Sequence, residues 1–260
     1  MAIDGTVVVT GGANGIGRAL AVEGAARGAS IVVLDRDDAA GTIKAVEAVG
    51  SRADAYVLDV TDQEAFAAAA EEILAKPDDL TTVIANVGVG APGALIDVAL
   101  EDVARVLDVN VVGTFRTVRT FLPRLRESAE KTGQAHVVIT GSEHSLGLPP
   151  DQVLGAYTVA KHALLGLADV LRTQLKGTGV SVTLLAPGWT TTRGVLAYLE
   201  QDPAAAETVY PVAQSPEEVA TVGWDAIEAG HFLAPTNLHS ESIAQERIAE
   251  IQRGFAALRK

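Results

Sequence analysis

The sequence of 260 residues contains no cysteine and a single methionine, and aromatic residues make up 4% of it. Without cysteine the chain cannot form disulfides, thiolate nucleophiles, iron–sulfur clusters or cysteine zinc sites. No apolar run approaches the ~18 residues of a membrane helix. The start, MAIDGTVVVT, has no basic segment before an apolar stretch and so does not read as a secretory signal. We therefore expect a cytoplasmic protein without a membrane partner.

Basic residues are also scarce. There are 20 lysines and arginines against 33 aspartates and glutamates, so the formal net charge is -13. Such an acidic chain is a poor electrostatic match for nucleic acid. Hydrophobic residues make up 48% of the sequence, which is too many for disorder and enough for one large core. These features favour a small molecule as the partner.

Apolar, β-branched runs alternate along the chain with longer alanine-rich segments. The predicted strands cover residues 6–10, 30–35, 53–59, 81–86, 136–140 and 180–186. The predicted helices cover residues 16–27, 38–49, 62–74, 100–125 and 157–175. Continuous Val, Ile and Leu runs are typical of parallel strands buried on both faces. The repetition predicts one α/β domain, a Rossmann-like doubly wound parallel sheet with helices on both faces.

A glycine-rich turn follows the first predicted strand and opens the first predicted helix. It reads TGGANGIG, with the spacing G-x-x-x-G-x-G over Gly11, Gly15 and Gly17. Glycines let the backbone approach a pyrophosphate, and a helix N-terminus supplies amide donors and a positive dipole. A tight turn without a ligand fits these residues as well. The place of the turn after the first apolar strand favours a nucleotide.

Asp35 ends the second predicted strand, 24 residues after Gly11. A carboxylate at this point can accept hydrogen bonds from both hydroxyls of an adenosine ribose, and it would repel a 2′-phosphate. We therefore expect NAD as the cofactor, with NADP less favoured. Two alternatives stay open: Asp35 could cap the next helix, and Arg36 could pair with a 2′-phosphate.

Tyr157 and Lys161 lie four residues apart in YTVAKHALLGL and therefore share one face of a predicted helix. A tyrosine of pKa about 10 is a poor acid or base at neutral pH, but a neighbouring ammonium lowers that pKa. The pair could then exchange a proton with an alcohol or carbonyl oxygen. The spacing alone is more typical of a surface pair. Ser142, which ends HVVITGS, and Asn110, in an apolar helical segment, strengthen the catalytic interpretation.

In this combination the sequence resembles the short-chain dehydrogenase/reductase family, from Val7 to about Thr192. TGGANGIG resembles the T-G-x-x-x-G-x-G turn, PGWTTT resembles the P-G-x-x-x-T element, and ANVG resembles N-N-A-G with Ala85 in place of the first Asn. The resemblance implies a set of cofactor-binding residues, namely Gly11, Asn14, Gly15, Ile16, Gly17, Asp35, Asp59, Val60, Asn86, Gly88, Tyr157, Lys161, Pro187, Thr190 and Thr192.

The resemblance also implies the catalytic residues Asn110, Ser142, Tyr157 and Lys161, and no metal. Tyr157 would be the general acid/base, and Lys161 would lower its pKa and hold the nicotinamide ribose. Ser142 would position the substrate oxygen, Asn110 would anchor a relay water, and hydride would move between substrate and nicotinamide. Residues 1–140 would mainly bind cofactor, 141–230 would carry catalysis and substrate, and 231–260 would form an atypical tail with a helix.

Two features depart from the family's pattern. Ser142 precedes Tyr157 by 15 residues, and Ser145, at 12, is a rival; we prefer Ser142 because it directly follows the strand. The tail has a short apolar run and an amphipathic helix in place of the usual glycine-rich strand ending. We expect a homodimer or homotetramer, because the helices around residues 100–125 and 157–175 still allow the family's helix-bundle dimer.

Several residues lie near the expected substrate pocket. His144 could orient a polar substrate, although a water-exposed loop histidine is the simpler interpretation. The segment after the P-G element could line an apolar pocket or pack as an ordinary helix; its candidates are Trp189, Val195, Leu196, Tyr198 and Leu199. The other histidines show no metal spacing, and we interpret them as structural or surface residues: His136, His162, His231 and His239.

The sequence therefore predicts an NAD-dependent oxidoreductase that interconverts a secondary alcohol and a ketone on a small, apolar substrate. Three alternatives stay open: an NADP-dependent ketoreductase, a related reaction without net redox change, and a catalytically silent nucleotide-binding regulator. The substrate itself is not identified, because substrate loops vary on a fixed scaffold.

Overall fold

The structure is a computed structural model that describes residues 5–149 and 154–259. Its strands are β1 (Thr6–Thr10), β2 (Ser30–Asp35), β3 (Ala53–Val57), β4 (Leu80–Ala85), β5 (Ala135–Thr140), β6 (Val180–Ala186) and β7 (Leu233–Pro235). Its helices are α1 (Gly15–Ala26), α2 (Ala40–Ala48), α3 (Gln63–Leu74), α4 (Leu100–Leu107), η1 (Asp108–Val112), α5 (Gly113–Thr132), η2 (Glu143–Ser145), α6 (Gly155–Gln174), α7 (Arg193–Gln201), α8 (Pro203–Val209), α9 (Pro216–Glu228), η3 (Leu238–Ser240) and α10 (Glu241–Ala257).

The described residues form a seven-stranded sheet in the order β3-β2-β1-β4-β5-β6-β7. Each neighbouring pair runs parallel, so all the carboxyl ends of the strands lie at one edge. The chain builds outward from β1 to β3, then returns to β4 and builds outward to β7. The two directions diverge between β1 and β4, and the crevice at such a switch point is where ligands bind in doubly wound sheets. The predicted fold class is confirmed.

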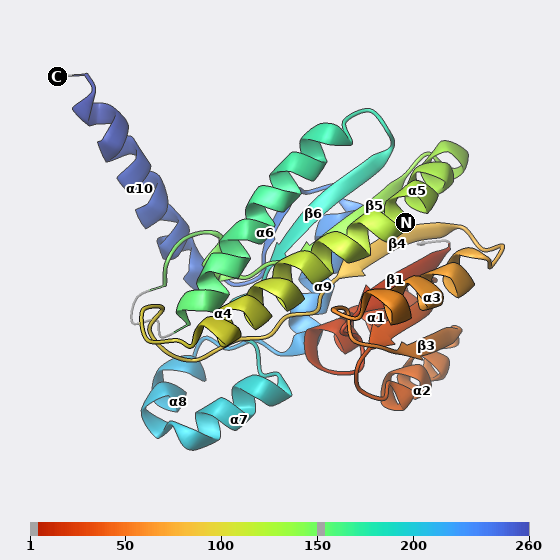
Figure 1. The fold of residues 1–260 in the computed structure, drawn as a ribbon, viewed down its shortest axis with the longest axis horizontal. Coiled ribbons are helices and arrows are strands. Elements are labelled where there is room, and N and C mark those ends of the chain that lie inside the picture. Colours follow the sequence, from red (N-terminus) through yellow and green to blue (C-terminus); the bar gives the residue numbers. More distant parts are fainter. Residues whose placement is uncertain (1–4, 150–153, 260) are drawn as a thin grey trace.

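Helices cover both faces of this sheet (Figure 1). One hydrophobic cluster joins Phe66 of α3, Phe121 of α5 and Leu164 of α6 to one face. The other cluster joins Leu20 of α1 and Trp224 of α9 to the opposite face. Side chains alternate along a strand, so the strands from β1 to β6 contribute to both clusters, and this explains why they read as continuous apolar runs.

The predicted elements are found with shifts of one or two residues at their ends, with one exception. The single helix predicted over residues 100–125 is divided into α4, a π-helical turn (η1) and α5. π turns widen a helix locally and occur at functional positions. Here the turn contains Asn110, whose buried amide must reach a backbone partner on the loop after β4.

The carboxyl-terminal third contains elements that the sequence reading missed. Helices α7, α8 and α9 follow β6, and α9 begins with a capping box in which Ser215 and Glu218 bond each other's backbone amides. That S-x-x-E signature was present in the sequence. Residues 231–259 contain β7 and α10, and Figure 1 shows α10 projecting from the sheet with the C-terminus at its end. Across the described ranges, no helix is long and apolar enough to cross a membrane.

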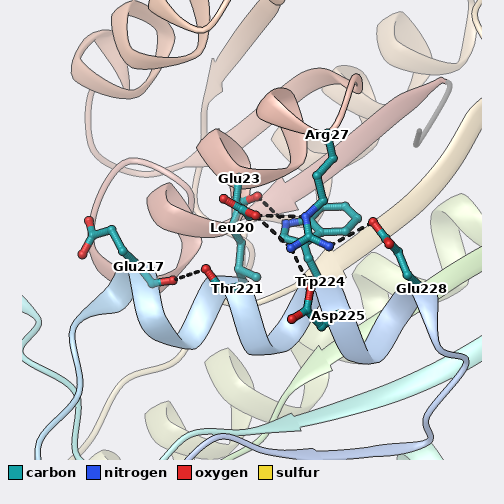
Figure 2. A network of polar contacts seen from close by, with 8 residues as sticks. All are labelled: Leu20, Glu23, Arg27, Glu217, Thr221, Trp224, Asp225 and Glu228. Atoms are coloured by element: carbon teal, nitrogen blue, oxygen red, sulfur yellow. Dashed lines mark hydrogen bonds and ion pairs between the residues drawn. The ribbon is translucent and has the colours of Figure 1, made fainter. Parts of the chain in front are cut away.

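Helices α1 and α9 pack against each other through Trp224, which is completely buried. Its indole Nε1 donates to the carbonyl of Leu20 at 2.9 Å (Figure 2). Beside it, Arg27 of α1 pairs with Asp225 and Glu228 of α9 at 2.8 and 2.9 Å. Partly exposed ion pairs contribute little to stability, so burial of the indole is the main contribution to this contact.

The α1–α9 contact leaves no room for a side chain at Gly24, where an added Cβ would lie 2.5 Å from Cζ2 of Trp224. We expect Gly24→Ala to destabilise the protein by about 1–3 kcal/mol through overpacking, although alanine favours a helix. Gly166→Ala is the matched control, since no atom lies within 4 Å of its added Cβ in α6. It should stabilise by about 0.5–1 kcal/mol. Urea unfolding measures the change in the free energy of unfolding for both variants, and equal changes would contradict the packing argument.

Candidate active site

A cavity of about 760 Å³ lies at the carboxyl edge of the sheet. Residues that follow each strand from β1 to β6 line it. All fifteen predicted cofactor residues are on its wall, together with three of the four predicted catalytic residues, Ser142, Tyr157 and Lys161. Asn110 is not on the wall. The volume suits a small-molecule site.

The glycine turn is packed so tightly that side chains are excluded from it. An added Cβ at Gly17 would lie 2.1 Å from the carbonyl oxygen of Gly11, and one at Gly12 would lie 2.9 Å from Val33. Thr42 fixes the turn from behind, because its hydroxyl donates to the carbonyl of Gly12 at 2.8 Å. The first turn of α1 has no acidic residue and its N-cap makes no side-chain bond, so its amides face the cavity uncapped.

Asp35 lies at the cavity wall and also holds the glycine turn. Its Oδ2 accepts from the amide of Ala13 at 2.8 Å, and its Oδ1 accepts from the amide of Asp37 at 3.0 Å. The alternative of a cap on α2 is not found, since α2 begins at Ala40 without a side-chain cap from Asp35. Arg36 also lines the cavity. Both charges considered for cofactor choice therefore face it.

Asp59 and Val60 form the wall after β3. The amide and the hydroxyl of Thr61 both donate to Oδ1 of Asp59, at 2.8 and 2.7 Å. These bonds, with the nearby charges of Arg36 and Arg116, hold the pKa of Asp59 below its usual range. Asp59 is thus an ionised carboxylate with further acceptor capacity.

Asn86 connects β4 to the glycine turn. Its Nδ2 donates to the carbonyls of Thr10 and Gly11 at 3.3 and 3.2 Å, and its own amide bonds the Thr10 hydroxyl at 3.0 Å. Ala85, the departure from the family's pattern, is 1% exposed and packs in the core. Asn86 and the Thr10 hydroxyl, which also donates to the carbonyl of Ile84 at 3.5 Å, therefore make the polar connection between the central strands at this point.

Tyr157 and Lys161 are buried together on α6. Lys161 is 2% exposed, and its Nζ donates to the carbonyl of Thr140 at 2.8 Å. Burial lowers the pKa of Lys161 to about 8. Burial also raises the pKa of Tyr157 to about 12, and the carboxyl of Glu143 adds to this rise. Burial is thus the largest cause of the raised pKa of Tyr157, and the lowering expected from Lys161 stays a prediction.

Ser142 faces Tyr157, whereas Ser145 does not reach the cavity wall. Ser142 hydrogen-bonds the phenol oxygen, which partly opposes the rise of the tyrosine pKa. Ser145 is 1% exposed, and its hydroxyl donates to the carbonyl of Lys161 at 2.8 Å and accepts from the Ser142 amide at 3.2 Å. The geometry thus favours Ser142 as the serine beside the tyrosine and makes Ser145 a support for both.

Asn110 lies one layer behind the wall and is 0% exposed. Its Oδ1 accepts from the amide of Val89 at 2.8 Å, and its Nδ2 donates to the carbonyl of Val89 at 3.0 Å. The loop after β4 is therefore held against η1. Gly88 completes this contact, since an added Cβ there would lie 3.3 Å from Nζ of Lys161 and 3.7 Å from Oδ1 of Asn110.

His144 is buried, not exposed as expected from a loop position. It is 4% exposed, and its Nδ1 lies 2.8 Å from the hydroxyl of Thr158. Its ring meets that of Tyr157 edge to face at 5.2 Å between centroids. Burial is the main cause that lowers the pKa of His144 to about 4. The imidazole is therefore neutral at pH 7.

Among the residues of the cavity wall that were not predicted from the sequence, Thr140 and Glu143 carry polar groups beside Ser142. Thr140 is 6% exposed, and among the described residues its hydroxyl finds no hydrogen-bond partner. Glu143, between Ser142 and His144, is 4% exposed. The available signal was the position of both residues, which flank the end of the strand that leads to Ser142.

The segment after β6 divides between cavity and packing. Trp189 and Tyr198 stack with their ring centroids 6.3 Å apart, and both line the cavity together with Val195. Leu199 is buried in the packing, and Leu196 is exposed outside the cavity wall. Pro187, Thr190 and Thr192 also lie on the wall, and the methyl of Thr192 would meet an added Cβ at Gly15 at 3.1 Å.

The remaining histidines have structural or surface positions. His136 bonds Ser181, and its pKa is lowered by burial; His162 bonds the carbonyl of Thr158. His231 and His239 are exposed. Within residues 5–149 and 154–259, no group of His, Asp and Glu side chains is arranged to hold a metal ion.

Comparison with known proteins agrees with this geometry. The family model described as short chain dehydrogenase matches residues 5–202. The 1-deoxy-11-beta-hydroxypentalenate dehydrogenase of Streptomyces avermitilis is 32% identical over 259 residues, which cover 96% of this chain and 91% of that protein. A short chain dehydrogenase/reductase from Burkholderia phymatum, solved in complex with NAD, is 28% identical and superposes with a TM-score of 0.82 over 98% of this chain and 96% of that one.

A second solved structure bears on the nucleotide. A dehydrogenase from Beutenbergia cavernae with bound NADP at low occupancy is 29% identical, with a TM-score of 0.77. It covers 89% of this chain and 94% of that one. The two solved neighbours therefore hold different forms of the nicotinamide dinucleotide.

Burial of His144 makes the protein sensitive to acid. The pKa of His144 is about 4 in the fold, against about 6.5 when unfolded, so between these values the unfolded chain binds more protons. Stability should therefore fall as pH drops from 6.5 towards 4, by up to about 3 kcal/mol. His144→Gln should remove this part of the loss, whereas His231→Gln, which changes an exposed residue, should not. Urea unfolding between pH 7 and 4 measures this loss of stability. If the free energy of unfolding depended on pH identically in wild type and His144→Gln, the role of His144 would be refuted.

Proposed function

This chain belongs to the short-chain dehydrogenase/reductase family of oxidoreductases, and from that premise we propose that it interconverts a secondary alcohol and a ketone with NAD. One observation carries the proposal. Ser142, Tyr157 and Lys161, a hydroxyl, a phenol and an ammonium, are on the wall of the cavity that also contains the glycine turn. Groups for proton transfer and a cradle for a dinucleotide therefore share one space.

The residues of the cavity fit a nicotinamide dinucleotide. Its pyrophosphate would meet the uncapped amides of α1, where only glycine fits at Gly17. Thr140 and Lys161 would meet the nicotinamide ribose, since the Thr140 hydroxyl is buried and has no partner. When bound, the cofactor would exchange a hydride with the substrate carbon. The protein would bind, orient and move a proton.

The proton would move through Tyr157. With a pKa of about 12, Tyr157 is a neutral phenol at pH 7 and can donate its proton to a carbonyl oxygen during ketone reduction. Ser142, beside the phenol on the cavity wall, would hold the substrate oxygen. Lys161, with a pKa of about 8, contributes a buried ammonium that favours the phenolate left behind.

Asn110 would act through Val89. Asn110 does not line the cavity. Its side-chain oxygen and nitrogen both hydrogen-bond to the backbone of Val89. We therefore propose that Asn110 is a positioning residue that holds the loop after β4 against Lys161.

The substrate end of the cavity has apolar walls, which support a mainly apolar alcohol or ketone. Trp189, Val195 and Tyr198 form one side, and Val89 and Leu154 also line the cavity.

A second copy of the chain is expected on the helical face of α5 and α6, where Phe115 and Val170 are 47% and 53% exposed. The homodimer or homotetramer stays a prediction.

The cofactor choice depends on two neighbouring charges. Asp35 supports NAD, because its fixed carboxylate would repel a 2′-phosphate. A second candidate is the NADP-dependent form of the same reaction, which Arg36 favours because it lines the same end of the cavity. We favour NAD because Asp35 is held by two backbone amides at the wall.

Replacement of Tyr157 tests the reaction. We expect Tyr157→Phe to lower kcat by a factor of 100 or more, in line with the loss of a general acid, while NADH still binds. Tyr210→Phe is the control, because Tyr210 is 52% exposed and lies outside the cavity. NADH absorbance with a panel of secondary alcohols and ketones gives the rates, and fluorescence titration gives cofactor affinity. Undiminished turnover by Tyr157→Phe would overturn the mechanism.

Cofactor titration tests the role of Asp35. Wild type should bind NADH more tightly than NADPH, and Asp35→Asn should shift this ratio at least about tenfold towards NADPH by removing the repulsion. Asp37→Asn removes the same charge two residues away and should shift the ratio less. Tighter binding of NADPH by wild type would reject NAD in favour of the second candidate, in which case Arg36→Ala should weaken NADPH binding.

A further inference from the structure

Glu143 is a buried acid in the cavity to which no function has so far been given. It opens η2 between Ser142 and His144 and is 4% exposed. Its amide donates to the carbonyl of Pro187 at 2.8 Å, which fixes its backbone between β5 and β6. Its side chain is among those that line the cavity. It is therefore a rigidly placed carboxyl group beside the serine and the tyrosine.

Only one of the two carboxyl oxygens is satisfied by the chain. Oε2 accepts from the hydroxyl of Ser240 at 2.7 Å. Across residues 5–149 and 154–259, no group donates to Oε1. Among the described residues, Oε1 is not one of the fully buried atoms that lack a partner, so it opens onto the cavity, and a substrate that covers it without donating a hydrogen bond would leave it unsatisfied at a cost in free energy. An acceptor with no donor, on the wall of a ligand cavity, points to a donor on the ligand.

The carboxyl also lies within electrostatic reach of the reacting proton. Its charge is one of the causes that raise the pKa of Tyr157, and burial raises the pKa of Glu143 itself. In the described parts of the chain no lysine or arginine forms an ion pair with Glu143. A cation or a neutral donor near the reacting carbon would stabilise this carboxyl more than an apolar group would.

We propose that Glu143 determines substrate choice by accepting a hydrogen bond from a hydroxyl or ammonium group that the substrate carries close to its reacting carbon. This inference rests on the proposed function and narrows it. The apolar walls would hold most of the substrate, and one polar substituent would face Oε1. Specificity of this kind is strong, because an analogue without the donor leaves the buried acceptor unpaired.

A purely structural role for Glu143 makes a different prediction. Through Ser240, the carboxyl fastens the segment that leads into α10. Gly188 is part of the same contact, since an added Cβ there would lie 3.2 Å from Oε2 of Glu143 and 3.3 Å from the Ser240 hydroxyl. If that contact were its whole role, changes at Glu143 would affect all substrates equally.

Three matched alcohols separate these roles: trans-2-aminocyclohexanol, trans-cyclohexane-1,2-diol and trans-2-methylcyclohexanol. They differ in the one group beside the reacting carbon, an ammonium, a hydroxyl or a methyl. Wild type should prefer a donor-bearing alcohol over the methyl analogue in kcat/KM. Glu143→Leu should reduce this preference at least tenfold. Glu143→Gln, which keeps an acceptor oxygen, should retain a preference for hydroxyl and lose one for ammonium, so the variants distinguish the two donors.

The Ser240→Ala variant is the control, because it breaks the internal bond and leaves the carboxyl in place. It should alter stability without changing the ratios between the three alcohols. Equal ratios in wild type and Glu143→Leu would overturn the inference while leaving the proposed function intact. If no alcohol or ketone is turned over although NADH binds, the proposed function fails.

If there is no turnover, the inference about Glu143 is tested by binding alone. The measurement is the rise in the Tm of the NADH complex that each of the three alcohols causes. A larger rise with a donor-bearing alcohol than with the methyl analogue, lost in Glu143→Leu, would support it. Equal rises would overturn it.

Discussion

The parallel pairing of β1 with both β2 and β4 is the constraint on which the rest of the structure depends. It places the glycine turn at the point where the two halves of the sheet diverge, and it leaves a crevice there. At this crevice Asn86 connects β4 to the glycine turn, because its side-chain nitrogen donates to the carbonyls of Thr10 and Gly11. Residues that are distant in sequence, such as Asp35 and Pro187, then share one cavity because every strand ends at the same edge.

Burial gives the groups in this cavity their chemical character. A buried ammonium is costly unless it is paired, and Lys161 has the carbonyl of Thr140 as its hydrogen-bond partner. The same lack of solvent keeps Tyr157 and His144 neutral at pH 7, because it raises the pKa of the phenol and lowers that of the imidazole. The charge of Glu143 acts in the same direction on Tyr157. The proton chemistry is thus set by desolvation more than by one neighbouring charge.

The carboxyl-terminal segment contacts a residue of the cavity wall, although its helix α10 projects away from the sheet (Figure 1). Ser240, at the start of that helix, holds the carboxyl of Glu143, and Asn237 donates to the carbonyl of Val212 at 2.6 Å. The segment that departs from the family's pattern is therefore bonded to the cavity wall at Glu143. Loops and tails that differ between proteins on one scaffold are a general source of different substrate choices.

The sequence by itself determined the fold class and many of the residues that line the cavity, but not Thr140 or Glu143. Apolar runs of strand length and the glycine turn are local signals, because neighbouring residues in the sequence are enough to recognise them. It did not determine the π turn at Asn110, the burial of His144, the elevated pKa of Tyr157 or the place of Glu143. Each of these depends on contacts between segments far apart in the chain, as when the Glu143 carboxyl meets Ser240 or the Asn110 amide meets Val89. Desolvation and hydrogen-bond partners arise only when those segments pack, so only the tertiary structure decided them.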